Sequence, residues 1–120
     1  MIDEKEFFID LATAIPSNTE WSMQSSFSEV VAALDGIPIN KNSTDIDFTF
    51  TEDHRSKIIG LANADLFQCI NMLMVYQGTA KLLEAFDGFV IVILSKSFDV
   101  TTTNLEKYLN NDLLYVSDDW

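Results

Sequence analysis

The sequence contains very few of the residues from which disulfides, metal sites and catalytic triads are built. Cys69 is the single cysteine and His54 the single histidine among 120 residues. One cysteine excludes an intramolecular disulfide, and one cysteine with one histidine excludes a structural zinc site, which takes four such ligands. Cys69 lies in a strongly apolar segment, where a thiol is usually inert and fills space in the core.

An active site would have to depend on His54 or on a pair of carboxylates, and the paired carboxylates of this chain lie in polar segments that indicate solvated surface. A hydrolase triad needs a histidine held by a carboxylate, together with a nucleophile on a sharp turn. Asp53 is the neighbour of His54, but adjacent side chains usually diverge, and the sequence has no Gly-x-Ser-x-Gly motif. The four glycines are scattered, which excludes a glycine-rich phosphate-binding loop. We therefore interpret His54 as a solvated turn residue and predict no enzyme, no catalytic residues, no metal and no cofactor.

Long apolar runs are also absent. The longest, Phe89–Leu94, is far shorter than the roughly 20 residues that a membrane-spanning helix needs. The chain begins with acidic residues where a secretion signal would carry basic ones. These features predict a cytoplasmic protein with no membrane partner.

Positive charge is scarce. Seven Lys and Arg residues stand against 19 Asp and Glu, which gives a net charge of −12. Residues 1–53 alone hold eleven of the acids and only two lysines. Such a field repels nucleic acid and attracts cationic partners, although acidity also serves solubility, and that alternative stays open. We expect a basic protein partner and no nucleic-acid partner.

Capping residues and apolar spacing predict about five helices. Ser-x-x-Glu or Asp-x-x-Glu patterns, or a capping threonine, mark helix starts, and glycine or proline marks helix ends. The predicted helices begin at Asp3, Ser26, Asn63, Thr79 and Thr103. The segment from Asn63 is apolar almost all round as far as Tyr76, which predicts a helix buried on most sides. The polar segment 17–25 is expected to be a loop.

Three segments predict strands. Residues 45–51 alternate apolar and polar side chains, as a half-buried strand does. The continuous apolar run Phe89–Leu94 predicts a central strand covered on both faces, and 113–116 predicts a short final strand. Residues 57–61 fit either a strand or a helix. The fold class that follows is α/β: one domain over residues 1–120, with a small mixed or mostly parallel sheet of three to four strands packed with about five helices.

Acidic side chains close to tryptophans are the candidate partner contacts, because a rigid aromatic ring can anchor a partner that charge has steered. The predicted partner-binding residues are Glu20, Trp21, Asp45, Asp47, Glu52, Asp53, Asp118, Asp119 and Trp120. Trp21 could instead pack at the edge of the core, and Trp120 could belong to a disordered terminus.

Two segments resemble barstar, the inhibitor of a bacterial nuclease. Residues 26–36, Ser-Phe-Ser-Glu-Val-Val-Ala-Ala-Leu-Asp-Gly, are similar to its second helix, and Phe89–Ser95 is similar to its terminal strand. In size and acidity the chain also resembles the immunity proteins that neutralise nuclease toxins, including those of contact-dependent growth inhibition. The resemblance implies a toxin inhibitor whose acidic face fills the basic cleft of a nuclease, and it assigns no individual binding residue.

The expected function is therefore a toxin-neutralising immunity protein, for which a monomer is favoured over a dimer. A secretion chaperone and a nucleic-acid-mimicking inhibitor are the alternatives. A chaperone would normally be a dimer with an apolar groove, whereas a mimic would compete with DNA for a host protein.

Overall fold

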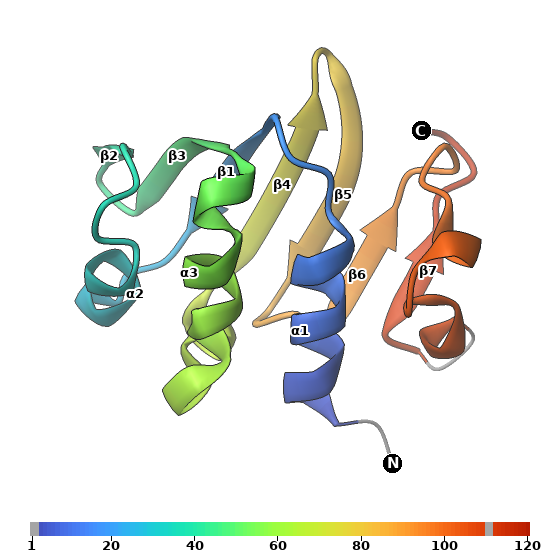
Figure 1. Cartoon of the computed structure of the whole chain (residues 1–120), viewed down its shortest axis with the longest axis horizontal. Helices are drawn as coiled ribbons and strands as arrows, with labels where there is room; N and C mark the ends of the chain where they lie inside the picture. Colours follow the sequence, from blue (N-terminus) through green and yellow to red (C-terminus); the bar gives the residue numbers. More distant parts are fainter. Residues whose placement is uncertain (1–2, 110–111) are drawn as a thin grey trace.

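The computed structural model describes residues 3–109 and 112–120, which form one seven-stranded sheet with helices packed on one face (Figure 1). The strand order is β2-β3-β1-β4-β5-β6-β7. Every neighbouring pair is antiparallel except β6 and β7, which are parallel. The strands are β1 (Thr19–Gln24), β2 (Asn40–Asn42), β3 (Asp45–Phe50), β4 (Met72–Gln77), β5 (Ala80–Phe86), β6 (Ile91–Leu94) and β7 (Leu114–Val116).

The helical layer is built from short elements. The α-helices are α1 (Glu4–Ala14), α2 (Ser28–Ala33) and α3 (Arg55–Ile59), and the 3-10 segments are η1 (Glu52–His54), η2 (Gly60–Cys69), η3 (Val100–Thr102) and η4 (Glu106–Tyr108). Contacts between aromatic side chains hold the helical elements of this layer against one another. Phe8 stacks on Phe67 at 4.8 Å between ring centroids, and Phe7 meets Tyr108 edge-on at 4.7 Å. These contacts fix α1 against η2 and η4.

The predicted sheet and helix count are wrong. The compact domain does mix helices and strands, but its described residues form seven strands and three α-helices, against the expected three to four strands and about five helices. The pairing is mostly antiparallel, because hairpins and short links join β2 to β3, β4 to β5 and β5 to β6, and most of these strands were not expected to be strands.

Residues 17–25, expected to be a loop, contain the strand β1. Thr19, Trp21 and Met23 are buried, whereas the side chains between them are exposed or partly exposed. The period of two was present in the sequence, but the polar alternate residues made the segment look like a loop. β1 lies between β3 and β4, so it is an interior strand of the sheet.

The two helices expected from Asn63 to Phe86 are mostly strand. Only η2 is helical, and the chain then forms the hairpin β4–β5 through a two-residue turn at Gly78-Thr79. Gly78 has φ 63°, a conformation that glycine adopts without strain. Because Met72, Met74 and Tyr76 are almost as apolar as the buried Leu73 and Val75, the period of two was hidden in the sequence.

The run Phe89–Leu94 forms β6 only from Ile91, and the helices cover one of its faces. Val92 and Leu94 are buried, whereas Ile91 is 40% exposed. The expected central strand with cover on both faces is therefore wrong. β6 pairs with β5 and with β7, so one short strand separates it from the edge of the sheet.

Several predicted elements are confirmed. Asp3 caps α1 by accepting hydrogen bonds from the backbone of Lys5 and Glu6. β3 and β7 occupy the predicted segments, and residues 57–61 are helical. The second and last helices are shorter than expected. No side chain caps α2 at Phe27, in place of the expected capping box, and the predicted helix from Thr103 contains only the 3-10 turn η4.

Candidate partner-binding surface

The sheet face opposite the helices carries exposed and partly exposed side chains, and we name it the open face. Along β1, β3, β4 and β6 these side chains alternate with buried ones that point to the helical layer. The strand register joins them into rows, one of which runs Asn40, Asp47, Ser22, Met74, Glu84, Ile93 and Tyr115. The open face is thus a continuous surface that crosses all seven strands.

The part of the open face on β1 and β3 is acidic. It contains Glu20, Asp45 and Asp47, and we name this part the acidic half. Thr49 lies opposite Glu20 and donates a hydrogen bond to its carboxylate at 3.0 Å. Neither strand contains a lysine or arginine, and Lys41 of β2 donates to the carbonyl of Ser43 at 2.7 Å. The acidic half therefore keeps a negative potential that its own strands do not neutralise.

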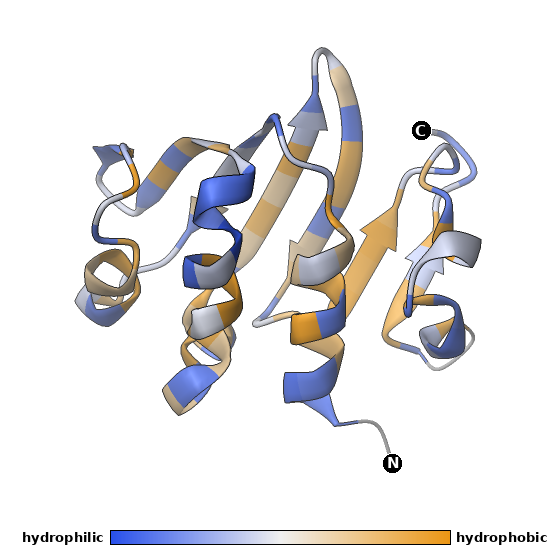
Figure 2. Cartoon of the chain, in the orientation of Figure 1, coloured by the Kyte–Doolittle hydropathy of each residue, from blue (hydrophilic) through white to orange (hydrophobic). Residues whose placement is uncertain are grey.

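The part of the open face on β4 to β7 is mainly apolar, and we name it the apolar half. Its members are Met72, Met74, Tyr76, Phe86, Ile91, Ile93 and Tyr115. In register, Met72 pairs with Phe86, which pairs with Ile91. Colouring by hydropathy shows that β6 is uniformly apolar, whereas β3 alternates along its length (Figure 2). Sequence reasoning missed the apolar half, because it took β4 and β5 for helices.

One ion pair lies within the apolar half. Lys81 and Glu84 of β5 form a salt bridge, and their side chains are 27% and 15% exposed. The hydrogen bond with Glu84 raises the pKa of Lys81, so the pair stays charged and internally neutral. The Lys81 ammonium lies over the ring of Trp120, and its nitrogen is 5.1 Å from the ring centroid. The predicted contact residue Trp120 is therefore half-buried and close to the apolar half.

The predicted contact residue Trp21 is on the other face. Its side chain is 3% exposed, its ring packs 4.7 Å from that of Phe50, and its indole N–H donates to the Thr19 hydroxyl at 3.0 Å. Trp21 is a core residue and cannot contact a partner in this structure. Asp118 and Asp119 are exposed, in the tail that follows β7.

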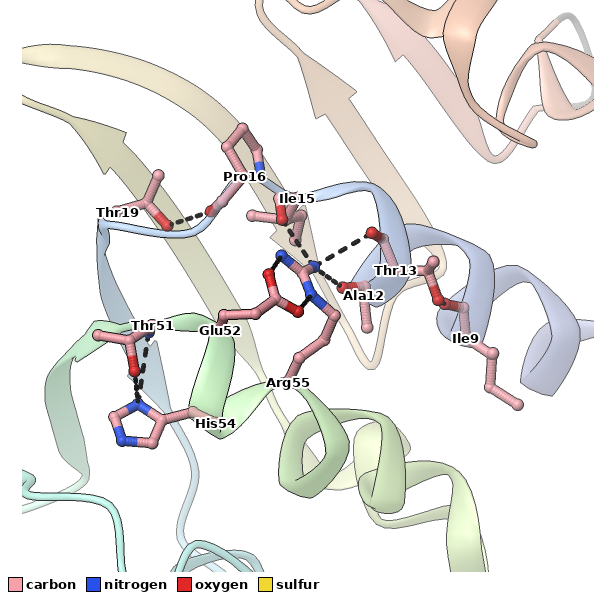
Figure 3. A network of polar contacts seen from close by, with 10 residues as sticks. All are labelled: Ile9, Ala12, Thr13, Ile15, Pro16, Thr19, Thr51, Glu52, His54 and Arg55. Carbon is pink, nitrogen blue, oxygen red and sulfur yellow. Dashed lines mark hydrogen bonds and ion pairs between the residues drawn. The ribbon is translucent and has the colours of Figure 1, made fainter.

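The fold divides the four predicted partner-binding acids that lie between residues 45 and 53. Asp45 and Asp47 lie on the open face, whereas Glu52 lies in η1 and is paired with Arg55 (Figure 3). Arg55 donates to the two oxygens of Glu52 at 2.7 and 2.9 Å, and this hydrogen bonding lowers the pKa of Glu52. Asp53 is exposed in the same turn. Glu52 is therefore a partner of Arg55 rather than a free carboxylate.

Arg55 also holds the end of α1. Its guanidinium donates to the carbonyls of Ala12, Thr13 and Ile15 at 2.8, 3.1 and 2.8 Å. These carbonyls lie at the carboxyl end of the helix, where backbone oxygens lack partners within the helix and carry partial negative charge. The guanidinium also lies over the ring of Phe50 at 4.9 Å. Arg55 thus joins α1, η1 and the sheet.

Replacing Arg55 with alanine is expected to lower the free energy of unfolding by about 2–3 kcal/mol, because several charge-assisted hydrogen bonds are lost together. Chemical denaturation measures the change. Lys57→Ala, which removes an exposed cation from the same helix, is the control and should cost less than about 0.5 kcal/mol. Equal losses in the two variants would contradict the role assigned to Arg55.

His54 has a local structural role. Its Nδ1 lies 3.4 Å from both the backbone nitrogen and the hydroxyl of Thr51, at the start of η1. The arrangement is a capping box: the side chain of Thr51 contacts the backbone of His54, and the side chain of His54 contacts the backbone of Thr51. The prediction that the protein is not an enzyme stays a prediction.

Residues 3–109 and 112–120 contain no group of three or more His, Cys, Asp or Glu side chains that could hold a metal ion. In the same ranges, no helix has both the length and the apolar character needed to cross a membrane. Comparison of the chain with protein-family models, with curated proteins and with solved structures gives no match.

Proposed function

We propose that this chain is a cytoplasmic immunity protein that binds a cognate bacterial toxin and neutralises it by covering its active-site cleft. The toxin is expected to be a basic nuclease, of the kind used in contact-dependent growth inhibition. The observation that carries the proposal is the acidic half: three carboxylates, Glu20, Asp45 and Asp47, on a sheet face with no basic residue on their own two strands.

Charge favours this function in two ways. A nuclease binds the phosphates of its substrate with cationic side chains, so a negative surface is complementary to its cleft. A net charge of −12 steers such a partner towards the protein and speeds encounter at low salt. The inhibitor needs no catalytic group of its own, because occlusion of the cleft is sufficient.

The apolar half favours a secretion chaperone as the second candidate. A chaperone keeps an apolar segment of its client in solution, and Ile91 and Tyr115 are 40% and 44% exposed. The two functions differ in assembly, because an immunity protein is expected to be a monomer and a chaperone a dimer. A nucleic-acid mimic has less support, since the acidic half is bordered by apolar rather than acidic side chains.

Co-expression with the protein encoded immediately upstream tests the immunity proposal. A tight one-to-one complex with a basic protein that stops growth when expressed alone, and rescue of growth by this chain, are the expected results. Light scattering of the free chain should give a monomer. A harmless neighbour, or one that does not co-purify, would contradict the immunity function, and a dimeric free chain would favour the chaperone.

A further inference from the structure

The geometry points to a specific occupant for the apolar half: an amphipathic helix of a basic partner protein, with its lysines and arginines on the side that faces the acidic half. The inference deepens the proposed function, from which it takes the basic character of the partner. It adds the secondary structure of the contact, its orientation and the residues that hold it.

The size of the apolar half fits one helix. Its main side chains come from the neighbouring strands β4, β5 and β6. Strands lie about 4.8 Å apart, so the outer two are separated by roughly 10 Å, close to the diameter of a helix with its side chains. From Met72 to Tyr76 the strand advances about 13 Å, which equals two to three helical turns.

The composition of the apolar half fits a protein contact. Met, Tyr and Trp are enriched at the centres of protein interfaces, where large and adaptable side chains exclude water. The apolar half contains Met72, Met74, Tyr76 and Tyr115, and Trp120 lies at its border. Lys81 and Glu84 neutralise each other, so the helix need not supply a charge above them.

Charge indicates the orientation of the helix and argues against a second copy of this chain as the occupant. Met72 and Met74 of β4 lie beside Gln24 and Ser22 of β1, and the next strand is β3, with Asp45 and Asp47. A helix seated on the apolar half therefore has one flank towards the carboxylates, where Lys or Arg is favourable. A second copy would bring another net charge of −12 to the same surface, and like charges oppose that contact.

The test uses the whole chain and three peptides of about 18 residues in an alanine-rich helical host. The first peptide has leucines at i, i+3, i+4 and i+7 with lysines on one side of that stripe. The second has the same composition with the leucines scattered, and the third has glutamate in place of lysine. NMR of methyl-labelled protein reports the site, and fluorescence anisotropy of labelled peptide reports the dissociation constant.

We expect the first peptide to bind and to shift the methyl signals of Met72, Met74, Ile91 and Ile93. The scattered and glutamate peptides should bind at least about 10-fold more weakly. The double variant Ile91→Thr/Ile93→Thr keeps β-branched side chains and so preserves strand propensity, but it should weaken binding of the first peptide by about 10-fold or more. Phe27→Thr is the matched control: Phe27 is 48% exposed at the start of α2, and this variant should change the affinity by less than about twofold.

Absence of binding, equal binding of the striped and scattered peptides, or unchanged affinity of the double variant would each overturn the inference. Concentration-dependent methyl shifts without peptide would also overturn it, because the occupant would then be a second copy. These results are independent of the immunity function. A toxin complex that forms while the striped peptide fails to bind removes only this inference, and a bound peptide with no toxin complex removes only the proposed function.

Discussion

Trp21→Ala is expected to lower the free energy of unfolding by about 3–5 kcal/mol, the usual cost of removing a large buried aromatic side chain. The indole is 3% exposed, packs against Phe48 and Phe50, and donates its N–H to Thr19. Its loss leaves a cavity between β1, β3 and the helical layer. Denaturant-induced unfolding, followed by circular dichroism, measures the change.

Trp120→Ala is the matched control for Trp21→Ala. Trp120 is half-buried and makes a cation–π contact with Lys81, so its removal should lower the free energy of unfolding by less than about 1 kcal/mol. Both tryptophans were predicted to contact a partner, whereas the fold buries Trp21 in the core and leaves Trp120 half-buried at the surface. Similar stability losses in the two variants would contradict that difference.

Reversing charge in the acidic half is expected to slow association with the cognate toxin by roughly 10-fold or more at low salt. The variant is Asp45→Lys/Asp47→Lys, both on the open face of β3. Its association rate should also lose most of its dependence on salt, because steering is the contribution that salt screens. Stopped-flow association with the purified toxin, at several salt concentrations, measures both effects.

Asp53→Lys/Glu106→Lys changes the net charge by the same amount and is the control. Asp53 and Glu106 are exposed in η1 and η4, away from the open face. Its association rate should fall by less than about threefold, since only the long-range field changes. If the two double variants slow association equally, net charge rather than the acidic half steers the toxin.

The parts of the fold that sequence reasoning found are those in which one period stands out. β3 alternates acids and threonines with Ile46, Phe48 and Phe50, and α1 carries its own cap at Asp3. Local signals were sufficient in both cases, because each element has one polar and one apolar face.

Sequence reasoning missed β1 and β4 for different reasons. β1 looked like a loop because its open-face residues are polar. β4 looked like a buried helix because Met72, Met74 and Tyr76 make its open face apolar as well. The feature that hid the strand is therefore the apolar half itself, and pairing with β1 and β5, which local sequence does not reveal, decides the conformation.

Of the candidate site, the sequence predicted Glu20, Asp45 and Asp47, which the fold does bring together on one face. It could not separate them from Glu52, because that carboxylate follows β3 by two residues, and only the turn into η1 and the pairing with Arg55 set it apart from the open face. It could not exclude Trp21 either, since an interior strand and a loop differ here only in long-range pairing.

Oxidative footprinting of the methionines tests most directly whether the open face is the binding surface. Met72 and Met74 are partly exposed on that face, whereas Met23 is fully buried and serves as an internal reference. The rate of sulfoxide formation is measured by mass spectrometry for the free chain and for the purified one-to-one toxin complex. The complex is expected to slow oxidation of Met72 and Met74 by about fivefold or more, with Met23 slow in both states. Unchanged oxidation of Met72 and Met74 in a fully formed complex would contradict this expectation, because the toxin would then lie elsewhere on the molecule.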